Sequence, residues 1–438
     1  MIVDAAVMTT ATTAATAPTA DTASTAATEP PSMATRAVHA GRADLGDLGV
    51  HAPPLDLSTT YPLPDVHRGG DAYERLATGG APRPDDSLVY ARLWNPTVAR
   101  FEDGLAELEQ ACAAVAFGTG MAALTAVLLG LGEGADPDGP RPHVVAVRPL
   151  YGGSDHLLAA GLCGTAVTFT DAALTRTDVA AAVAAATRPS TRLVVLETPA
   201  NPTLELVDVA AVVAAARASC PQAVVLVDNT FATPVLQQPL TLGADLVLHS
   251  ATKFIGGHGD AMGGVVAVGE HAAGWTERLR RVRAVTGGLL HPMGAYLLHR
   301  GLATLPLRVH RQGESATQVA AGLAQHRAVV AVHFPGLDGA DPAGLVGRQM
   351  SGPGSVLAFR VTGGFEAACA VAARVKLATH AVSLGGVDTL LQHPAALTHR
   401  PVAGEARPDA ALLRVSVGLE NPRDVLTDLV EALDTVCR

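Results

Sequence analysis

The stretch "AVVLVDNTFATPVLQQPLTLGADLVLHSATK", residues 223–253, determines the fold class. It holds two short apolar runs, and a polar residue ends or follows each of them. Four runs in the chain share this character: "HVVAV" (143–147), "RLVVLE" (192–197), "AVVLVD" (223–228) and "DLVLHS" (245–250). Helix-like stretches such as "VAAVVAAARA" (209–218) separate them. This alternation predicts βαβ units, and therefore an α/β fold whose parallel sheet is covered on both faces.

Composition narrows the class of protein. The chain has 438 residues and a net charge of −10, which argues against nucleic acid as its main partner. The longest uncharged stretch, 111–132, is interrupted by glycines and flanked by Glu109 and Glu133, so we expect no membrane span. The five cysteines are odd in number and form no CxxC pair, which favours a reduced, cytoplasmic setting.

The sequence divides into four regions. Residues 1–34 are rich in Ala and Thr and predict a disordered tail. Residues 35–94 show little periodicity and predict an extended N-terminal arm. Residues 95–304 hold the four apolar runs and predict a large domain. Residues 305–438 have longer helices and shorter strands, which predicts a smaller α+β domain.

Polar side chains gather where the predicted strands end. In open α/β sheets, ligands bind beyond the carboxyl ends of the strands. The residues at or just after these ends are Tyr151, Asn201, Asp228, Ser250, Thr252 and Lys253. A further short strand runs into Gly118-Thr119-Gly120 and a helix, whose first N–H groups suit a phosphate. This turn is neither a Walker loop nor a dinucleotide fingerprint, so it carries little weight alone.

Lys253 stands out because the chain otherwise uses arginine. Of its 31 basic residues, only Lys253 and Lys376 are lysines. A buried lysine can lose its proton and attack an aldehyde, whereas arginine stays protonated. A ligand with a phosphate would bind it at the Gly-rich helix start. A flat ring in the ligand would stack on Tyr151, and a protonated ring nitrogen would pair with Asp228. Pyridoxal phosphate (PLP) has all of these features. We expect Lys376, in "RVKLATHAV", to be a helix-surface residue.

The ordered motifs resemble one family. "YARLWNPTVARFEDGLAELE", "GTGMAAL", "PLYGG", "ETPANPT", "SATKFIGGHGD", "AVSLGGVDTLLQHPAALTH" and "LLRVSVGLEN" are similar to those of the Cys/Met-metabolism PLP enzymes. This family includes cystathionine gamma-synthase and gamma-lyase, O-acetylhomoserine sulfhydrylase and methionine gamma-lyase, which is the most similar branch. The resemblance covers residue 35 to the C-terminus and implies a PLP-dependent transferase fold of type I.

The resemblance also implies residue roles. Lys253 would bind the cofactor aldehyde and move protons, and Tyr151 would stack on the ring and act as acid and base. Asp228 and Asn201 would contact the ring nitrogen and the ring hydroxyl. Four groups would hold the phosphate: the Gly120 and Met121 N–H groups and the Ser250 and Thr252 hydroxyls. Tyr90 and Arg92, on the arm, would reach the phosphate of a neighbouring subunit in a homotetramer. Arg414 would bind the substrate α-carboxylate, with Ser383 and Val382 beside it.

Three departures from the family leave the reaction open. Gly153 stands where methionine gamma-lyases carry Cys, Arg283 and Ala284 replace a Lys-Asp pair, and Val382 replaces the Glu of cystathionine enzymes. We expect γ-elimination or γ-replacement on a sulfur-containing or O-acyl-homoserine-type amino acid. The alternatives are a γ-replacement synthase using sulfur or carbon nucleophiles, a β-lyase on cysteine or cystine, and a catalytically silent PLP-binding protein. "HGD" (258–260) lacks metal-ligand spacing, so no metal is expected.

Overall fold

The computed structural model describes residues 31–134, 138–171 and 178–437. The residues from Met33 onward form one compact unit. Nearly all of the predicted tail, residues 1–30, lies outside the described residues.

The larger sheet has seven strands in the order β1-β7-β6-β5-β4-β2-β3 among the described residues. The strands are β1 (Ala113–Phe117), β2 (His143–Arg148), β3 (Ala166–Asp171), β4 (Thr191–Glu197), β5 (Val224–Asp228), β6 (Leu246–His249) and β7 (Gly264–Val268). Strands β2 to β6 run parallel to one another, and β7 pairs antiparallel with both of its neighbours, β1 and β6. The four predicted runs are β2, β4, β5 and β6, so the expected mostly parallel sheet is confirmed.

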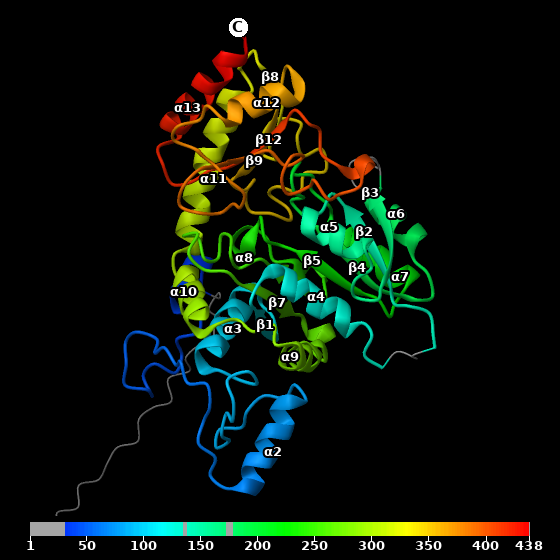
Figure 1. Cartoon of the computed structure of the whole chain (residues 1–438), viewed down its shortest axis with the longest axis vertical. Helices are drawn as coiled ribbons and strands as arrows, with labels where there is room; N and C mark the ends of the chain where they lie inside the picture. Colours follow the sequence, from blue (N-terminus) through cyan, green and yellow to red (C-terminus); the bar gives the residue numbers. More distant parts are fainter. Residues whose placement is uncertain (1–30, 135–137, 172–177, 438) are drawn as a thin grey trace, which may run out of the picture. The chain divides into compact units, whose positions relative to one another are not determined.

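Helices cover both faces of this sheet (Figure 1). In β2, Val144 and Ala146 pack into a cluster with α4 and α9, while Val145 and Val147 pack on the other face with α6 and α7. Successive side chains of a strand point to opposite faces, so a strand with both faces buried must be apolar throughout. The helices of this region are α3 (Pro96–Glu109), α4 (Gly120–Gly130), α5 (Gly152–Ala159), α6 (Val179–Ala186), α7 (Val209–Ser219), α8 (Thr233–Leu236), α9 (Trp275–Thr286) and α10 (Pro292–Leu302).

A second sheet of five strands, in the order β10-β11-β12-β9-β8, forms the smaller C-terminal part of the described chain. Its strands are β8 (Val329–His333), β9 (Val356–Val361), β10 (Thr379–His380), β11 (Leu390–Gln392) and β12 (Leu412–Ser416). The helices that pack with it are α11 (Leu305–Leu323), α12 (Gly364–Ala372) and α13 (Pro422–Asp434). In β12, Arg414 pairs with Gln392 of β11 and Ala358 of β9. This register sets where the Arg414 side chain begins.

Two helices that the sequence did not predict lie in the N-terminal part, and the first begins just before the predicted end of the tail at residue 34. They are α1 (Met33–His39) and α2 (Val66–Ala77), and α2 projects from the lower end of the unit in Figure 1. The Asp65 side chain caps α2 by accepting hydrogen bonds from two backbone N–H groups. Only Gly69, Ala72 and Leu76 of α2 are buried, which is too short an apolar pattern to stand out in the sequence.

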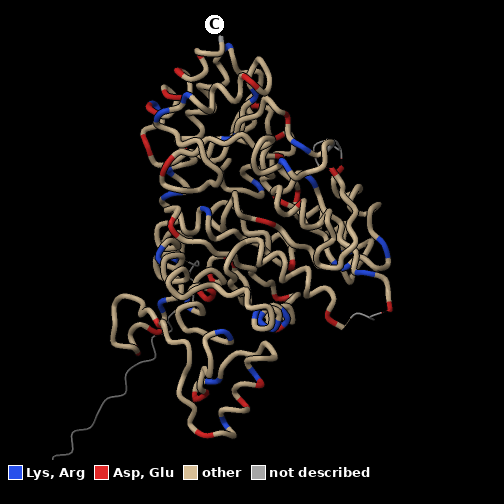
Figure 2. The backbone as a smooth tube through the Cα atoms, viewed as in Figure 1, with Lys and Arg blue, Asp and Glu red and all other residues tan. Residues whose placement is uncertain are grey.

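Acidic and basic residues are spread along the unit, and basic residues gather on α9 (Figure 2). Three of the four arginines of α9 form ion pairs: Arg278 and Arg281 with Glu133, and Arg283 with Glu102. Within the described residues, none of the helices combines the length and the apolar character that crossing a membrane requires.

Candidate active site

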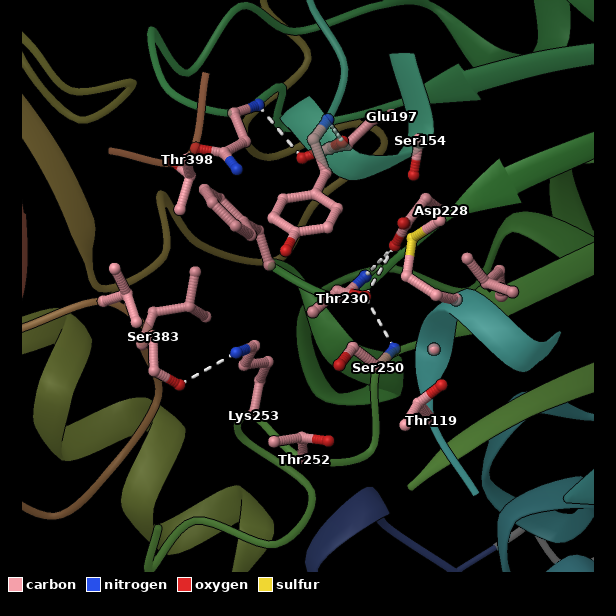
Figure 3. A pocket seen from close by; sticks show the side chains of 18 of the residues that line it. Thr119, Ser154, Glu197, Asp228, Thr230, Ser250, Thr252, Lys253, Ser383 and Thr398 are labelled. Carbon is pink, nitrogen blue, oxygen red and sulfur yellow. Dashed lines mark hydrogen bonds between the residues drawn. The ribbon is translucent and has the colours of Figure 1, made fainter. Parts of the chain in front are cut away.

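A cavity of about 250 Å³ opens where the carboxyl ends of β2, β4, β5 and β6 face the second sheet. Its walls include all of the predicted site residues except Tyr90 and Arg92. The predicted residues that line it are Gly120, Met121, Tyr151, Asn201, Asp228, Ser250, Thr252, Lys253, Val382, Ser383 and Arg414. Figure 3 shows Ser250 and Lys253, from the segment directly after β6, with Asp228 at the end of β5 and Ser383 from the C-terminal part, around one cavity.

Lys253 lies just beyond β6, and its Nζ donates a hydrogen bond of 2.8 Å to Ser383 Oγ (Figure 3). Burial, with the Arg414 charge adding to it, lowers the pKa of the Lys253 amine to about 8. A substantial neutral fraction at physiological pH makes the amine a nucleophile and a base. Ser383 has a φ of 97°, a left-handed conformation that is strained for serine and typical of functional sites.

The segment that carries Ser383 lies against the backbone beyond Lys253. A Cβ on Gly385 would lie 2.6 Å from the backbone nitrogen of Phe254, and Gly385 also has a positive φ of 77°. Glycine is therefore required there for the second sheet to bring Ser383 to the amine.

The start of α4 forms a cradle for an anion. The Thr119 side chain caps the helix by accepting from Ala122 N. The Gly120 and Met121 N–H groups have no intrahelical carbonyl because they are the first two of the helix. A Cβ on Gly120 would lie 3.0 Å from Ser250 Cβ, so glycine keeps this space open. Thr252 Oγ1 accepts from Gly263 N at 3.0 Å, which fixes its hydroxyl at the cavity wall. These groups fit a phosphate.

Asp228 is the last residue of β5, and its carboxylate accepts from the Thr230 hydroxyl at 2.6 Å and the Thr230 N–H at 3.0 Å (Figure 3). Burial raises the pKa of Asp228, and the Thr230 bonds and the nearby His249 oppose that effect. Among the described residues, no salt bridge joins Asp228 to a basic side chain. A buried carboxylate without a cation suits the protonated ring nitrogen of PLP.

Tyr151 and Asn201 share one buried partner. Glu197, at the end of β4, accepts from the Tyr151 N–H at 2.6 Å and from the Asn201 N–H at 3.0 Å. Burial raises the pKa of Glu197 well above its usual range, and neighbouring Asp228 raises it further. The Tyr151 side chain remains 38% exposed on the cavity wall, where a ring could stack on it.

Arg414 enters the cavity from the second sheet. Its Nη1 donates to Asn201 Oδ1 at 2.9 Å, and its Nη2 donates to the Ser383 carbonyl at 2.7 Å and to Gln392 Oε1. Burial lowers the pKa of Arg414 to about 10, so the guanidinium stays charged at neutral pH. Its Nε is buried without a hydrogen-bond partner in the described part of the chain, which leaves a donor for a carboxylate.

Tyr90 and Arg92 are not brought into the cavity of their own chain. Arg92 Nη1 donates to the Ala284 carbonyl at 2.5 Å, and its guanidinium lies 5.6 Å from the Tyr90 ring centroid. The two residues therefore form one cluster on the arm. Their assignment to a neighbouring subunit's phosphate stays a prediction.

Two of the departures from the family pattern, Gly153 and Arg283, lie in different parts of the structure. A Cβ on Gly153 would lie 2.6 Å from Tyr151 Cε1 and 3.2 Å from Met121 Sδ. The missing side chain thus gives the Tyr151 ring its present position. Arg283 instead bonds Glu102 and the Ala116 carbonyl in the interior, away from the cavity.

Several cavity residues were missed by the sequence analysis. They are Thr119, Ser154, Glu197, Thr230, Phe231, Leu248, Met262, Leu384, Gln392 and Thr398. Glu197 ends an identified strand run, so the strand-end rule that selected Asp228 could have found it. Gln392 and Thr398 lie within a quoted motif, but Gln392 meets Arg414 only through the pairing of β11 with β12, and Thr398 bonds Gln392. Lys376 lies on the surface, as expected, but beyond α12 rather than on a helix, where it pairs with Glu431.

The described residues do not bring three His, Cys, Asp or Glu side chains into a group that could hold a metal ion. His258, from the "HGD" stretch, instead lies 2.8 Å from the Gly256 carbonyl through its Nδ1.

The geometry agrees with the similarities to known proteins. Residues 34–434 match the model of the Cys/Met metabolism PLP-dependent enzymes. An L-methionine gamma-lyase from Brevibacterium sandarakinum is 58% identical over 88% of this chain and 93% of its own. A Streptomyces avermitilis L-methionine gamma-lyase is 50% identical over 88% of this chain and 85% of its own.

Solved structures give the same result. A methionine gamma lyase from Micromonospora echinospora superimposes with a TM-score of 0.76 at 38% identity, covering 92% of this chain and 99% of that one. A cystathionine gamma synthase from Xanthomonas oryzae pv. oryzae superimposes with a TM-score of 0.79 at 35% identity, covering 92% and 98%.

The fold and the site define a PLP-dependent enzyme of fold type I. The chain belongs to the Cys/Met metabolism PLP-dependent enzymes. The expected family, fold class, PLP cofactor and PLP-dependent carbon–sulfur lyase class are therefore confirmed, as is the similarity to methionine gamma-lyase.

Proposed function

We propose that the chain cleaves the Cγ–S bond of a sulfur-containing L-amino acid, with L-methionine as the leading substrate. The balanced reaction converts L-methionine and water into methanethiol, 2-oxobutyrate and ammonia. The observation that carries the proposal is the Lys253–Ser383–Arg414 arrangement, which places a partly neutral amine beside a buried carboxylate-binding guanidinium. When bound, PLP supplies an electron sink for carbanions next to the substrate amino group.

Arg414 binds the substrate α-carboxylate in this proposal. Asn201 and the Ser383 carbonyl hold two of its nitrogens, so the guanidinium is oriented before substrate arrives. Fixing the carboxylate places the substrate Cα near Lys253, which lines the same cavity.

Lys253 moves protons along the substrate. Its Nζ removes the proton from Cα, releases that proton, and then removes a proton from Cβ, which prepares departure of the γ-substituent. A pKa of about 8 suits an amine that must both accept and return a proton near neutral pH. The Tyr151 hydroxyl gives a proton to the departing sulfur. Asp228, Asn201, Ser250, Thr252 and the start of α4 hold the cofactor.

The open end of the cavity favours an uncharged γ-substituent. Val382 and Met262 line it and are 53% and 66% exposed. Both side chains are apolar and suit a methyl thioether. A distal ammonium, as in cystathionine, would meet Val382 rather than a carboxylate, which disfavours that substrate.

A second candidate function is γ-replacement, in which a nucleophile captures the unsaturated intermediate before hydrolysis. The departure at Gly153 from the methionine gamma-lyase pattern supports it, because the Tyr151 ring occupies the place that a side chain at this position would take. An O-acyl-homoserine would then be the first substrate, and a thiol or a carbon nucleophile the second.

The remaining assignments are also proposals. Residues 35–94 would form an arm that carries Tyr90 and Arg92 to a neighbouring subunit, residues 95–304 the PLP-binding domain, and residues 305–438 the C-terminal domain. A homotetramer built from two dimers with shared sites would follow. The clustered Tyr90 and Arg92, outside their own cavity, support this arrangement. The cysteine content supports a cytoplasmic location.

The test is a substrate panel measured by mass spectrometry. Methionine, homocysteine, cysteine, O-acetylhomoserine and O-succinylhomoserine are each incubated with and without an added thiol. Formation of 2-oxobutyrate from methionine without a thiol supports the proposal. Product formed only with a nucleophile identifies a synthase, and turnover confined to cysteine identifies a β-lyase.

Two lysine variants control this panel. Lys253→Ala should abolish turnover, whereas Lys376→Ala should not, because Lys376 is a surface residue paired with Glu431. An active Lys253→Ala enzyme would refute the assignment of Lys253.

A further inference from the structure

The peptide group between Leu150 and Tyr151 is held at both of its polar atoms by buried side chains. The Tyr151 N–H donates to Glu197 Oε2 at 2.6 Å, and the Leu150 carbonyl lies 3.2 Å from His399 Nε2. Glu197 is 4% exposed and His399 is 2% exposed. Because this peptide plane sets the direction in which the Tyr151 side chain leaves the backbone, the two side chains orient the ring.

A chain of hydrogen bonds runs from Arg414 to His399. Arg414 Nη2 donates to Gln392 Oε1, and Gln392 Nε2 donates to Thr398 Oγ1 at 2.5 Å. Thr398 Oγ1 lies 3.1 Å from His399 Nδ1. Since this hydroxyl already accepts from Gln392, its own proton is free to point at Nδ1.

The direction of this chain fixes the histidine tautomer. Burial lowers the pKa of His399 to about 4, so the ring is neutral near pH 7 and carries one N–H. With Nδ1 accepting from Thr398, the proton lies on Nε2 and points to the Leu150 carbonyl. Bonds aligned in one direction from a charged donor polarise and strengthen one another.

A second chain links Arg414 to Glu197. Arg414 Nη1 donates to Asn201 Oδ1 at 2.9 Å, and the Asn201 N–H donates to Glu197 Oε1 at 3.0 Å. The two chains therefore close a ring of hydrogen bonds between Arg414 and the Leu150–Tyr151 peptide.

Close steric contact restricts movement within this ring of hydrogen bonds. A Cβ on Gly152 would lie 2.1 Å from the Thr398 carbonyl oxygen, so the Thr398 backbone lies directly against the start of α5. A shift of Thr398 or His399 would therefore displace the backbone that carries Tyr151.

We propose that Glu197, Thr398 and His399 are positioning residues that couple carboxylate binding at Arg414 to the orientation of Tyr151. A carboxylate that engages the guanidinium competes for its donors and changes the polarity of both chains. The Tyr151 hydroxyl is thereby aimed when an amino acid is bound. This inference rests on the proposed roles of Arg414 and Tyr151.

The test compares Thr398→Val with Thr398→Ser in the PLP-loaded enzyme. Valine keeps the side-chain shape and removes the hydroxyl, whereas serine keeps the hydroxyl. The chain has five tyrosines, so the Tyr151 signal of Cζ-labelled tyrosine can be identified in the NMR spectrum by its loss in Tyr151→Phe. L-norleucine, which has an α-carboxylate and no leaving group, is the probe, and the cofactor absorbance confirms saturation.

We expect norleucine to shift the Tyr151 signal in wild type and in Thr398→Ser, and to shift it much less in Thr398→Val. Equal shifts in the two Thr398 variants, or no shift in wild type, would overturn the coupling. The measurement needs no turnover, so its result does not depend on whether the enzyme carries out the proposed reaction.

Kinetics provide a second measurement. Thr398→Val should lower kcat about 10- to 100-fold, the scale expected from a misplaced catalytic group, with a smaller change in KM. In a Tyr151→Phe background the same change should cost less than about twofold if its effect acts through the Tyr151 hydroxyl. An undiminished loss in that background contradicts the coupling. An unchanged kcat in Tyr151→Phe alone contradicts the proposed acid role of Tyr151 instead.

His399 offers a second pair of variants in case Thr398→Val does not fold. His399→Gln can still donate to the Leu150 carbonyl, whereas His399→Asn is too short to do so. Only the Asn variant should lose the norleucine-dependent shift, and loss of the shift in neither variant would refute the role of His399.

Discussion

The amine of Lys253 should titrate near pH 8 in the cofactor-free protein, because burial and the Arg414 charge lower its pKa from 10.5 to about 8. A lowered pKa enriches the neutral amine as the pH rises through 8. At pH 8 roughly half of the Lys253 amines would be neutral, against about 0.3% for an unperturbed lysine. The reactive form is thus enriched roughly 150-fold.

Pulsed acetylation across pH 6–11, read by peptide mass spectrometry, measures this titration. The chain has only two lysines, so each acetylated amine maps to one peptide, and surface-exposed Lys376 serves as the internal reference. Removing the charge in Arg414→Met should move the Lys253 midpoint upward. Arg348→Met is the matched control, because Arg348 pairs with Asp208 on the surface and does not line the cavity.

A Lys253 midpoint near 10.5 would refute the reasoning, since the amine would then be solvated rather than buried. A midpoint near 8 that does not move in Arg414→Met would retain burial as the cause and remove the contribution of Arg414.

Three further predictions concern the site. Arg414→Ala should cost about 3–5 kcal/mol of substrate binding, or about 10²- to 4 × 10³-fold in kcat/KM, because the buried substrate carboxylate loses its partner. Gly153→Cys should displace the Tyr151 ring, whose Cε1 lies 2.6 Å from the new Cβ, and lower kcat by up to about 10²-fold. Mixing inactive Arg92→Ala with inactive Lys253→Ala should restore part of the activity if sites are shared between subunits.

A specific result would contradict each of these three predictions. An unchanged KM in Arg414→Ala would remove Arg414 from the substrate site, with Arg348→Ala as the surface control. Full activity in Gly153→Cys would show that the ring position does not govern the rate. No recovery on mixing, with refolded mixtures confirmed by native mass spectrometry, would argue against a shared site.

Local sequence determined much of the fold and the core of the site. The apolar runs that became β2, β4, β5 and β6 were readable, because a strand buried on both faces must be apolar at every position. Parallel strands end at the same sheet edge, so Asp228 and Lys253 could be placed there from their positions alone. The ordered motifs then indicated the family and PLP.

Tertiary structure decided how the two sheets complete the site. Arg414 contacts Asn201 across 213 residues of sequence, and Lys253 contacts Ser383 across 130. Periodicity is a short-range property, so it cannot report which residues of β11 and β12 face the larger sheet. The lowered pKa of Lys253 and the raised pKa of Glu197 likewise arise from burial that only packing creates. The sequence determined which chemical groups are present, whereas the packing of the two sheets determined their distances and charge states.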